Sequence, residues 1–251
     1  HRDLHSFPTR RSSDLHIGYR PGGPNLGTID AGTGLPVGQP AFEEDTLKSY
    51  EVGFKAETAD RRYGLDFAAY SIDWSNIQLS VIRGGFGAIV NAPGGANIRG
   101  AELALAARPT SDVVLTAGFA YQDAQLAEAD PDLGGAEGER LPSTPRFTAT
   151  VSADYDLPWG GFQPTVGATA RYVTDRTASF DNSTSFPQYH LPHYTSADLR
   201  AGFSFGTVSA QLYVRNVFDE RGQLSLIFPQ FGARVAIVQP RTFGIGLATR
   251  F

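Results

Sequence analysis

The 251-residue sequence contains neither cysteine nor methionine. The lack of cysteine excludes disulfide bonds, thiol chemistry and cysteine-based metal centres. Because translation starts at a methionine, its absence leads us to expect a fragment or a processed piece of a longer protein. The formal net charge of −5 leaves no basic excess, so we expect no nucleic-acid partner.

Long apolar stretches are also missing. The longest unbroken run, Leu103–Ala107, is far shorter than the roughly 18 residues of a transmembrane helix. The mean hydropathy of −0.21 does not exclude a membrane protein, because strands of a transmembrane barrel alternate and average near neutral. No phosphate-binding loop, no His-Glu-x-x-His motif and no nucleophile spaced from a base is found, so we expect no catalytic residue, cofactor or resident metal.

Glycine, proline and aromatic residues are plentiful, and this composition suits many strands and turns. The clearest strand is the C-terminal stretch Pro240–Phe251. Phe243, Ile245, Leu247 and Phe251 fall on one face of it, and small or polar residues fall on the other. Such a strand is typical of the last strand of an outer-membrane β-barrel. The alternative is the last strand of a soluble sandwich, with Phe251 in its core.

Period-two alternation predicts about nine full strands and the end of another. They are expected at residues 16–20 (partial), 47–57, 63–74, 98–107, 112–122, 146–156, 165–173, 195–205, 208–214 and 240–251. The connections alternate between short turns near Thr58, Pro109, Trp159 and Gly206 and long loops that begin near residues 21, 75, 123, 174 and 216. Outer-membrane barrels have short periplasmic turns and long extracellular loops, so the pattern predicts an all-β, antiparallel transmembrane β-barrel fragment with its apolar faces toward lipid.

The N-terminal segment differs in character from the rest of the chain. His1–Leu15 is basic and lacks the alternation of the rest, and it resembles translated read-through of a sequencing adaptor. A basic targeting or interaction segment is the alternative. We therefore expect residues 1–15 to be non-native and residues 16–251 to form one barrel portion.

Seven motifs run in order along residues 16–251. They are GYRPGG at Gly18–Gly23, EDTLKSYEVGFKAE at Glu44–Glu57, the stretch Phe67–Gln78, NAPGGANIRGAE at Asn91–Glu102, LPSTPRFT at Leu141–Thr148, VRNVFDERG at Val214–Gly222, and the terminal PRTFGIGLATRF. As a series, they resemble the C-terminal barrel of TonB-dependent outer-membrane receptors, the siderophore and nutrient uptake proteins.

The resemblance implies a larger barrel of about 22 strands behind an N-terminal plug domain. The chain would then hold roughly the last half of that barrel, without the plug, the remaining strands and the plug segment that contacts the TonB complex. The implied function is active uptake of an iron–siderophore complex or similar scarce nutrient across the bacterial outer membrane. The terminal strand with Phe251 would be what the barrel-assembly machinery reads. A passive porin-like barrel and a soluble carbohydrate-binding β module are the alternatives, and an enzyme is the least expected class.

Candidate site residues fall into two groups. Charged residues on the predicted lumen faces are expected to pair across strands or to meet the plug, with direct substrate contact as the alternative. They are Glu102, Arg146, Arg171, Asp198 and Arg200. Aromatic residues in or near the external loops are expected to form an interfacial girdle or to pack within the loops, with stacking on a flat ligand as the alternative. They are Phe180, Phe186, Tyr189, Phe228 and Phe231.

Two sets of metal-type side chains are expected to be structural or solvated. His190 and His193 are interpreted as exposed loop histidines rather than a metal pair. The acidic loop offers oxygen ligands of the kind that Ca²⁺ prefers, but a solvated external loop is favoured. Its carboxylates are Asp123, Glu128, Asp130, Asp132, Glu137 and Glu139.

Overall fold

The structure, a computed structural model, describes residues 9–25, 28–29, 36–37, 39–83, 86–159, 163–183, 187–227 and 234–249. Every named element in this part of the chain is a β-strand. Within the same residues, no helix is both long enough and apolar enough to cross a membrane.

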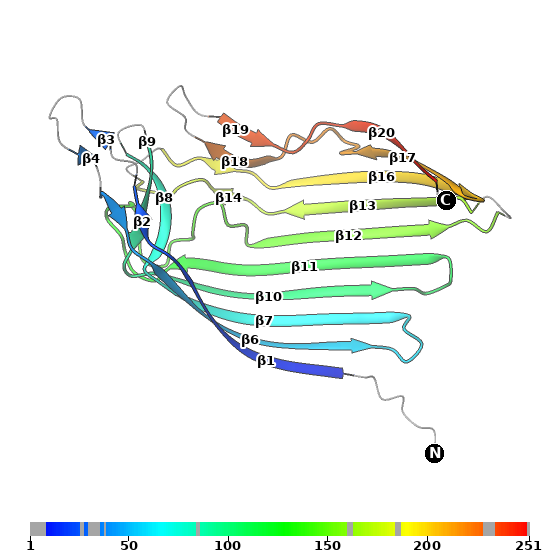
Figure 1. The fold of residues 1–251 in the computed structure, drawn as a ribbon, viewed down its shortest axis with the longest axis horizontal. Coiled ribbons are helices and arrows are strands. Elements are labelled where there is room, and N and C mark those ends of the chain that lie inside the picture. Colours follow the sequence, from blue (N-terminus) through cyan, green and yellow to red (C-terminus); the bar gives the residue numbers. More distant parts are fainter. Residues whose placement is uncertain are drawn as a thin grey trace, which may run out of the picture.

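Ten strands form one antiparallel sheet in the order β1-β6-β7-β10-β11-β12-β13-β16-β17-β20 (Figure 1). Their bounds are β1 Thr9–Arg20, β6 Asp45–Glu57, β7 Tyr63–Ser75, β10 Ala96–Ala107, β11 Val113–Leu126, β12 Phe147–Asp156, β13 Thr165–Val173, β16 Tyr194–Phe205, β17 Val208–Arg215 and β20 Thr242–Thr249. Each neighbour in the sheet is the next long strand along the chain. The predicted all-β, antiparallel architecture is confirmed, and the strand expected to be partial, β1, is a full strand of the sheet.

The strand β1 is longer than the sequence pattern indicates. It was expected to begin at His16, but its pairing with β6 begins at Thr9 opposite Ala56 and runs to Arg20 opposite Asp45. The edge of β6 presents unpaired N–H and C=O groups, and backbone pairing of this kind does not require alternating side chains. The expectation that residues 1–15 are non-native concerns the origin of the segment and stays a prediction.

The connections lie at two opposite ends of the sheet. Figure 1 places the short turns at one end, here called the turn end, and the long connections with their small hairpins at the other, here called the loop end. The hairpin pairs are β2 Gly23–Pro24 with β5 Ala41–Phe42, β3 Thr28–Ile29 with β4 Pro36–Val37, β8 Ile77–Arg83 with β9 Phe86–Ala92, β14 Arg176–Thr177 with β15 His190–Leu191, and β18 Gln223–Ile227 with β19 Arg234–Ile237.

Two features of the loop end differ from expectation. The segment 21–42 was expected to lack regular structure, yet it contains β2 to β5, because two-residue pairs need only one or two ladder hydrogen bonds. Residues 77–82 were expected to lie in the long loop that begins near residue 75, but they belong to β8, which pairs with β9 as a separate two-stranded sheet. The loop end is therefore a structured cap on the strands.

The apolar face of the main sheet is open. On β16, Leu199, Phe203 and Phe205 are 49%, 45% and 57% exposed, whereas Asp198 and Arg200 on the opposite face are half-buried. The same exposure of apolar residues recurs along β6, β17 and β20. A soluble barrel would turn this face inward, so the arrangement fits the predicted lipid-facing side and contradicts the soluble alternative.

The hydrophobic core lies at the loop end and not along the sheet. It joins residues of β8, β9, β10 and β11 to the loops that follow β11 and β14. Its members are Ile77, Val81, Val90, Ala92, Ala96, Ala124, Leu126, Leu133, Leu141 and Phe180. Burial of these side chains holds the long connections together as one packed unit.

Candidate functional site

An ion pair on the polar face of the sheet joins β16 to β12 across the intervening strand β13. The guanidinium of Arg200 on β16 donates from Nε to Asp154 Oδ1 of β12 at 2.8 Å and from Nη2 to Oδ2 at 2.5 Å. Its Nη1 also donates to Thr169 Oγ1 of the intervening strand β13 at 2.9 Å. The register places Gly167 of β13 between the two partners, opposite Asp154 on one side and Arg200 on the other.

Gly167 is what leaves room for this pair. A Cβ atom at that position would collide with Asp154 Oδ1 and with Arg200 Nε. A larger residue would therefore push the ion pair away from the sheet surface.

A second network joins β13 and β16 to the base of the next loop. Arg171 Nη1 donates to Asp198 Oδ2 at 2.7 Å, and Asp198 Oδ1 accepts from the backbone N–H of Asn216 at 2.9 Å. Asn216 is buried and has a positive φ of 51°. Its side-chain amide donates to the carbonyl oxygens of Glu220 and Gln239, each at 2.8 Å. Sequence reasoning quoted Asn216 only as part of a motif and missed its role as this anchor.

Arg171, Asp198, Arg200 and Asn216 of these two networks line a cavity of about 680 Å³ on the polar face. Arg171, Arg200 and Arg215 contribute three guanidinium groups, and Asp198 is the single carboxylate among the lining residues. Arg215 lies over the ring of Tyr213 at 5.0 Å, a cation–π contact that leaves the guanidinium without a carboxylate of its own among the described residues. Arg171 is paired with Asp198 and Arg200 with Asp154, so Arg215 supplies the remaining positive charge, and this charge favours a negatively charged occupant.

The other predicted lumen charges lie apart from this cavity. Glu102 is exposed on β10 and lines a smaller hollow with Asp66 and Thr150. Arg146 approaches Asp123 at 3.5 Å between Nη2 and Oδ1. The structure therefore brings together Arg171, Asp198 and Arg200 of the five predicted residues, and leaves the other two outside the group.

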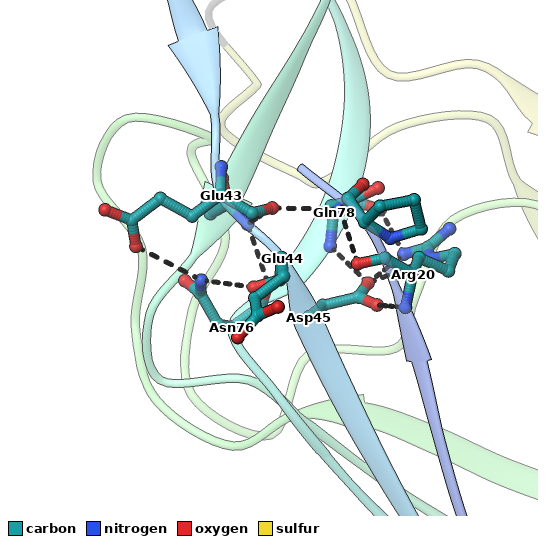
Figure 2. A network of polar contacts seen from close by, with 8 residues as sticks. Arg20, Glu43, Glu44, Asp45, Asn76 and Gln78 are labelled. Carbon is teal, nitrogen blue, oxygen red and sulfur yellow. Dashed lines mark hydrogen bonds and ion pairs between the residues drawn. The ribbon is translucent and has the colours of Figure 1, made fainter. Parts of the chain in front are cut away.

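A polar network at the loop end centres on Asp45, the first residue of β6. Asp45 is 1% exposed, and Figure 2 shows its carboxylate between Arg20 and Gln78. It accepts from Arg20 Nε at 2.9 Å, from the Arg20 backbone N–H at 3.2 Å and from the Gln78 backbone N–H at 3.0 Å. One buried carboxylate thus ties β1, β6 and β8 together.

Amide side chains extend this network to β9. Gln78 Nε2 donates to the carbonyl oxygen of Glu43 at 2.9 Å, and Asn76 Nδ2 donates to that of Glu44 at 2.8 Å (Figure 2). Asn91 Nδ2 also reaches the Glu43 carbonyl, at 3.0 Å. Residues from four of the sequence motifs meet here, a convergence that reading each motif separately did not reveal.

The two loop aromatics that the structure describes, Phe180 and Tyr189, are not exposed for stacking. Phe180 is 4% exposed and packs in the loop-end core, in agreement with loop packing. Tyr189 is half-buried, and its carbonyl oxygen accepts from the Ala178 N–H at 2.9 Å. Phe186, Phe228 and Phe231 lie outside the described residues.

The terminal strand β20 lies at the edge of the sheet. β20 pairs with β17, and Phe243, Ile245 and Leu247 are all exposed on the apolar face. Phe251 lies outside the described residues. An exposed apolar stripe on an edge strand is available to a partner that recognises it.

Two carboxylates of the acidic loop, Asp130 and Glu139, bind backbone N–H groups of the loops. Asp130 Oδ1 accepts the N–H groups of Asp132 and Leu133, and the two oxygens of Glu139 accept those of Ala136 and Asp181. These carboxylates cap loop backbone and do not converge on a cation. Across the described residues, no three His, Asp or Glu side chains are grouped as metal ligands.

The fold and the two faces define a β-barrel wall with an apolar outside and a charged inside. A family model described as "TonB dependent receptor-like, beta-barrel" matches residues 16–217, and the chain belongs to this family. Members of the family are bacterial outer-membrane proteins.

Named relatives are receptors. The metal-pseudopaline receptor CntO of Pseudomonas aeruginosa is 28% identical over 200 residues, which are 79% of this chain and 26% of that protein. The catecholate siderophore receptor Fiu of Escherichia coli K12 is 25% identical over 242 residues, 92% of this chain and 30% of that protein. The chain therefore spans between a quarter and a third of the length of these relatives.

Solved structures share the fold. The ferric yersiniabactin uptake receptor FyuA from Yersinia pestis superposes with a TM-score of 0.75 at 21% identity, covering 97% of this chain and 35% of that one. The closed form of Fiu gives a TM-score of 0.71 at 23% identity, covering 97% of this chain and 33% of that one.

Proposed function

We propose that this chain is the C-terminal barrel portion of an outer-membrane receptor that takes up an anionic metal–siderophore complex with energy from TonB. The loop end then faces outward, and the turn end faces the periplasm. A plug domain and further strands complete the barrel, and the plug carries the contact with the TonB complex. Residues 1–15 are proposed to be foreign to it, and sequencing source DNA across the junction at His16 tests this point.

The observation that carries the proposal is the cavity lined by Arg171, Arg200 and Arg215. It lies on the inner face, where a solute passing through the barrel would meet it. Arg171 and Arg200 are balanced by Asp198 and Asp154, and the guanidinium of Arg215 gives the cavity one further positive charge, which attracts negatively charged solutes. The relatives named for metal-pseudopaline and for catecholate siderophores support a chelated metal as the cargo.

The terminal strand is proposed to recruit the barrel-assembly machinery during insertion. Phe243, Ile245 and Leu247 form an exposed apolar stripe on the edge strand β20, and Phe251 follows it in the sequence. Lipid of the outer membrane is the proposed partner of the remaining apolar face.

Uptake of radioactive iron tests the transport proposal. The complete receptor is produced in an outer-membrane host that lacks other iron receptors, and uptake of an anionic ferric catecholate is compared with that of the cationic ferrioxamine B complex. We expect TonB-dependent uptake of the catecholate and little uptake of ferrioxamine B. The variant R171Q/R200Q should lose most catecholate uptake.

Arg108 provides the matched control, because it is exposed at the turn end and lies away from the cavity. R108Q should transport like the unaltered receptor. Uptake that continues without TonB would contradict the proposed mechanism. Equal uptake of the two complexes would contradict the proposed preference for anions.

A further inference from the structure

A second cavity, of about 550 Å³, lies inside the loop end and apart from the arginine-lined cavity. Its wall is mostly apolar and comes from β8, from the loop between β11 and β12, and from the segment after β14. Apolar side chains on this wall are Leu79, Val81, Leu133, Leu141, Phe180 and Leu226. These residues are far apart in the sequence, so the cavity forms only when the loops pack together.

Backbone contacts hold the two loops that form the wall. Ser143 N–H donates to the carbonyl oxygen of Thr177 at 2.6 Å, and Asn182 N–H donates to that of Gly134 at 3.2 Å. Gly134 has φ 70°, and a Cβ there would collide with the Asn182 carbonyl group. The close approach of the loops therefore depends on glycine at this position.

Two buried polar atoms of cavity-lining residues have no hydrogen-bond partner. They are the indole Nε1 of Trp74 and the hydroxyl Oγ of Ser179. Ser179 is only 4% exposed, so bulk water does not solvate its hydroxyl. Buried polar groups are nearly always hydrogen-bonded, and two unpaired ones in one apolar cavity indicate that a partner enters it.

The chemistry of the two groups defines that partner. An indole N–H can only donate, and a serine hydroxyl can donate or accept. The partner must therefore present an acceptor oxygen to Trp74, and the apolar wall favours a flat or compact hydrocarbon body behind it. A single water, with its share of roughly 30 Å³ of liquid volume, satisfies the polar atoms but leaves most of the cavity unfilled. Cavities of roughly 300–1,000 Å³ are the size that binds small organic molecules.

Arg20 fixes the position of the Trp74 ring. Its guanidinium lies 4.8 Å from the centre of that ring and also donates from Nε to Asp45 Oδ2 at 2.9 Å. The Asp45 network of Figure 2 thus also orients one wall of the cavity. The indole is presented in one orientation before any ligand arrives, which lowers the entropic cost of binding.

We propose that this cavity binds an aromatic or similarly compact apolar group that carries an acceptor oxygen, held by hydrogen bonds from Trp74 Nε1 and Ser179 Oγ. It is a site separate from the arginine-lined cavity. It depends on the proposed function only in that small molecules reach the loop end from outside the cell.

The test uses fluorine NMR of the complete receptor labelled with 5-fluorotryptophan in detergent. The resonance of Trp74 is the one that W74F removes, and W159F identifies the exposed tryptophan near the turn end as a control. The probes are benzoate, which offers acceptor oxygens, and benzylammonium, which has the same ring and offers only donors. We expect benzoate to shift the Trp74 resonance saturably, and benzylammonium to leave it unchanged.

The variant S179A should weaken benzoate binding by about fivefold, the loss expected for one hydrogen bond. S204A, which removes a serine hydroxyl from β16 near the turn end, should not change it. No saturable benzoate shift, or an equal shift with benzylammonium, would overturn the proposal without reference to any variant. Unaltered affinity in S179A would show that water alone satisfies the hydroxyl and would also overturn it.

This outcome is independent of the uptake result. Benzoate binding at Trp74 is measured on purified protein and needs neither TonB nor iron. Loss of ferric catecholate uptake with intact benzoate binding would overturn only the transport proposal, and the reverse result would overturn only this one.

Discussion

At the scale of single residues, Gly167 determines whether two strands can share an ion pair. Its missing side chain lets Arg200 reach Asp154 across β13. We expect G167A to break the pair, so that the further substitution R200Q costs less stability in G167A than in the unaltered protein. A partly exposed pair of this kind is worth about 0–1 kcal/mol, which sets the expected coupling energy. A double-mutant cycle on the unfolding free energy in detergent measures it.

Gly118 supplies the control for this cycle, because a Cβ atom there would meet open space. G118A and R200Q should be additive. Coupling of equal size in both cycles would mean that the effect of G167A does not come from contact with the ion pair.

Asp219, in the loop after β17, makes one local contact sensitive to pH. The backbone N–H of Arg241 and the guanidinium of Arg221 donate to Asp219 and hold the pKa of its carboxyl below the usual range. The pKa of an aspartate carboxyl in the unfolded chain is about 3.9, and at pH values above it a carboxyl whose pKa is lowered by folding stabilises the folded state. This stabilisation is lost as the pH falls through the lowered pKa of the folded state. We therefore expect exchange of the Arg241 amide, corrected for intrinsic rates, to rise as the pH falls below about 4.

The variant D219N should remove this pH dependence, because an amide does not titrate in that range. D73N, which removes an exposed carboxylate from β7, should retain it. The same acid-induced rise in D219N as in the unaltered protein would show that another group is responsible.

At the scale of elements, Asp45 attaches the β8–β9 hairpin to the main sheet. Its carboxylate is buried and accepts from two backbone N–H groups and from Arg20. D45N replaces an acceptor oxygen with a donor, and hydrogen bonds to charged groups contribute about 1.5–3 kcal/mol each. We expect faster amide exchange throughout β8 and β9, measured by hydrogen–deuterium exchange with mass spectrometry.

The pair Lys55–Asp66 is the comparison for Asp45. It also joins neighbouring strands, but both side chains are largely exposed. D66N should change exchange little, because exposed ion pairs contribute about 0–1 kcal/mol. If D45N leaves β8 and β9 as protected as D66N does, the hairpin is held by its hydrophobic core instead.

The elements also show which parts of the fold the sequence predicts. The strand Thr165–Val173 was predicted to the residue, because alternation is local and its flanks carry turn residues. The lumen positions of Arg171, Asp198 and Arg200 follow from the same alternation. The cavity beside Trp74 and the burial of Phe180 do not, because they depend on contacts between segments that are distant in the sequence. Periodicity carries no information on such contacts.

At the scale of the whole molecule, the exposed apolar face requires a nonpolar surrounding. Leu199 lies on that face in the interior of the sheet, and Gln211 lies on the opposite face on the neighbouring strand. An arginine on a lipid-facing strand costs about 2–4 kcal/mol at the bilayer midplane and little in a watery lumen. We expect L199R to reduce the amount of heat-modifiable receptor in the outer membrane and Q211R to leave it near normal. Equal losses would contradict the assignment of the two faces.

The ten-stranded sheet does not close into a barrel, and its two free edges determine whether the chain can insert into a membrane by itself. β1 and β20 each have a single neighbour, so each presents a row of unpaired backbone groups at one side of the ten-stranded sheet. Each unpaired group costs several kcal/mol in hydrocarbon, which no exposed apolar face can offset. We expect the 251-residue chain, refolded in detergent, to aggregate, whereas the complete receptor runs on gels as a heat-modifiable monomer.

Two results would contradict this expectation for different reasons. A heat-modifiable monomer of the chain alone would mean that β1 and β20 can close on each other. A soluble monomer without detergent would mean that the apolar face is covered, and the lipid-facing side would then be wrong. If the chain alone aggregates and the complete receptor inserts, both features are supported. Insertion requires the apolar outer face, and aggregation of the chain alone follows from its two open edges.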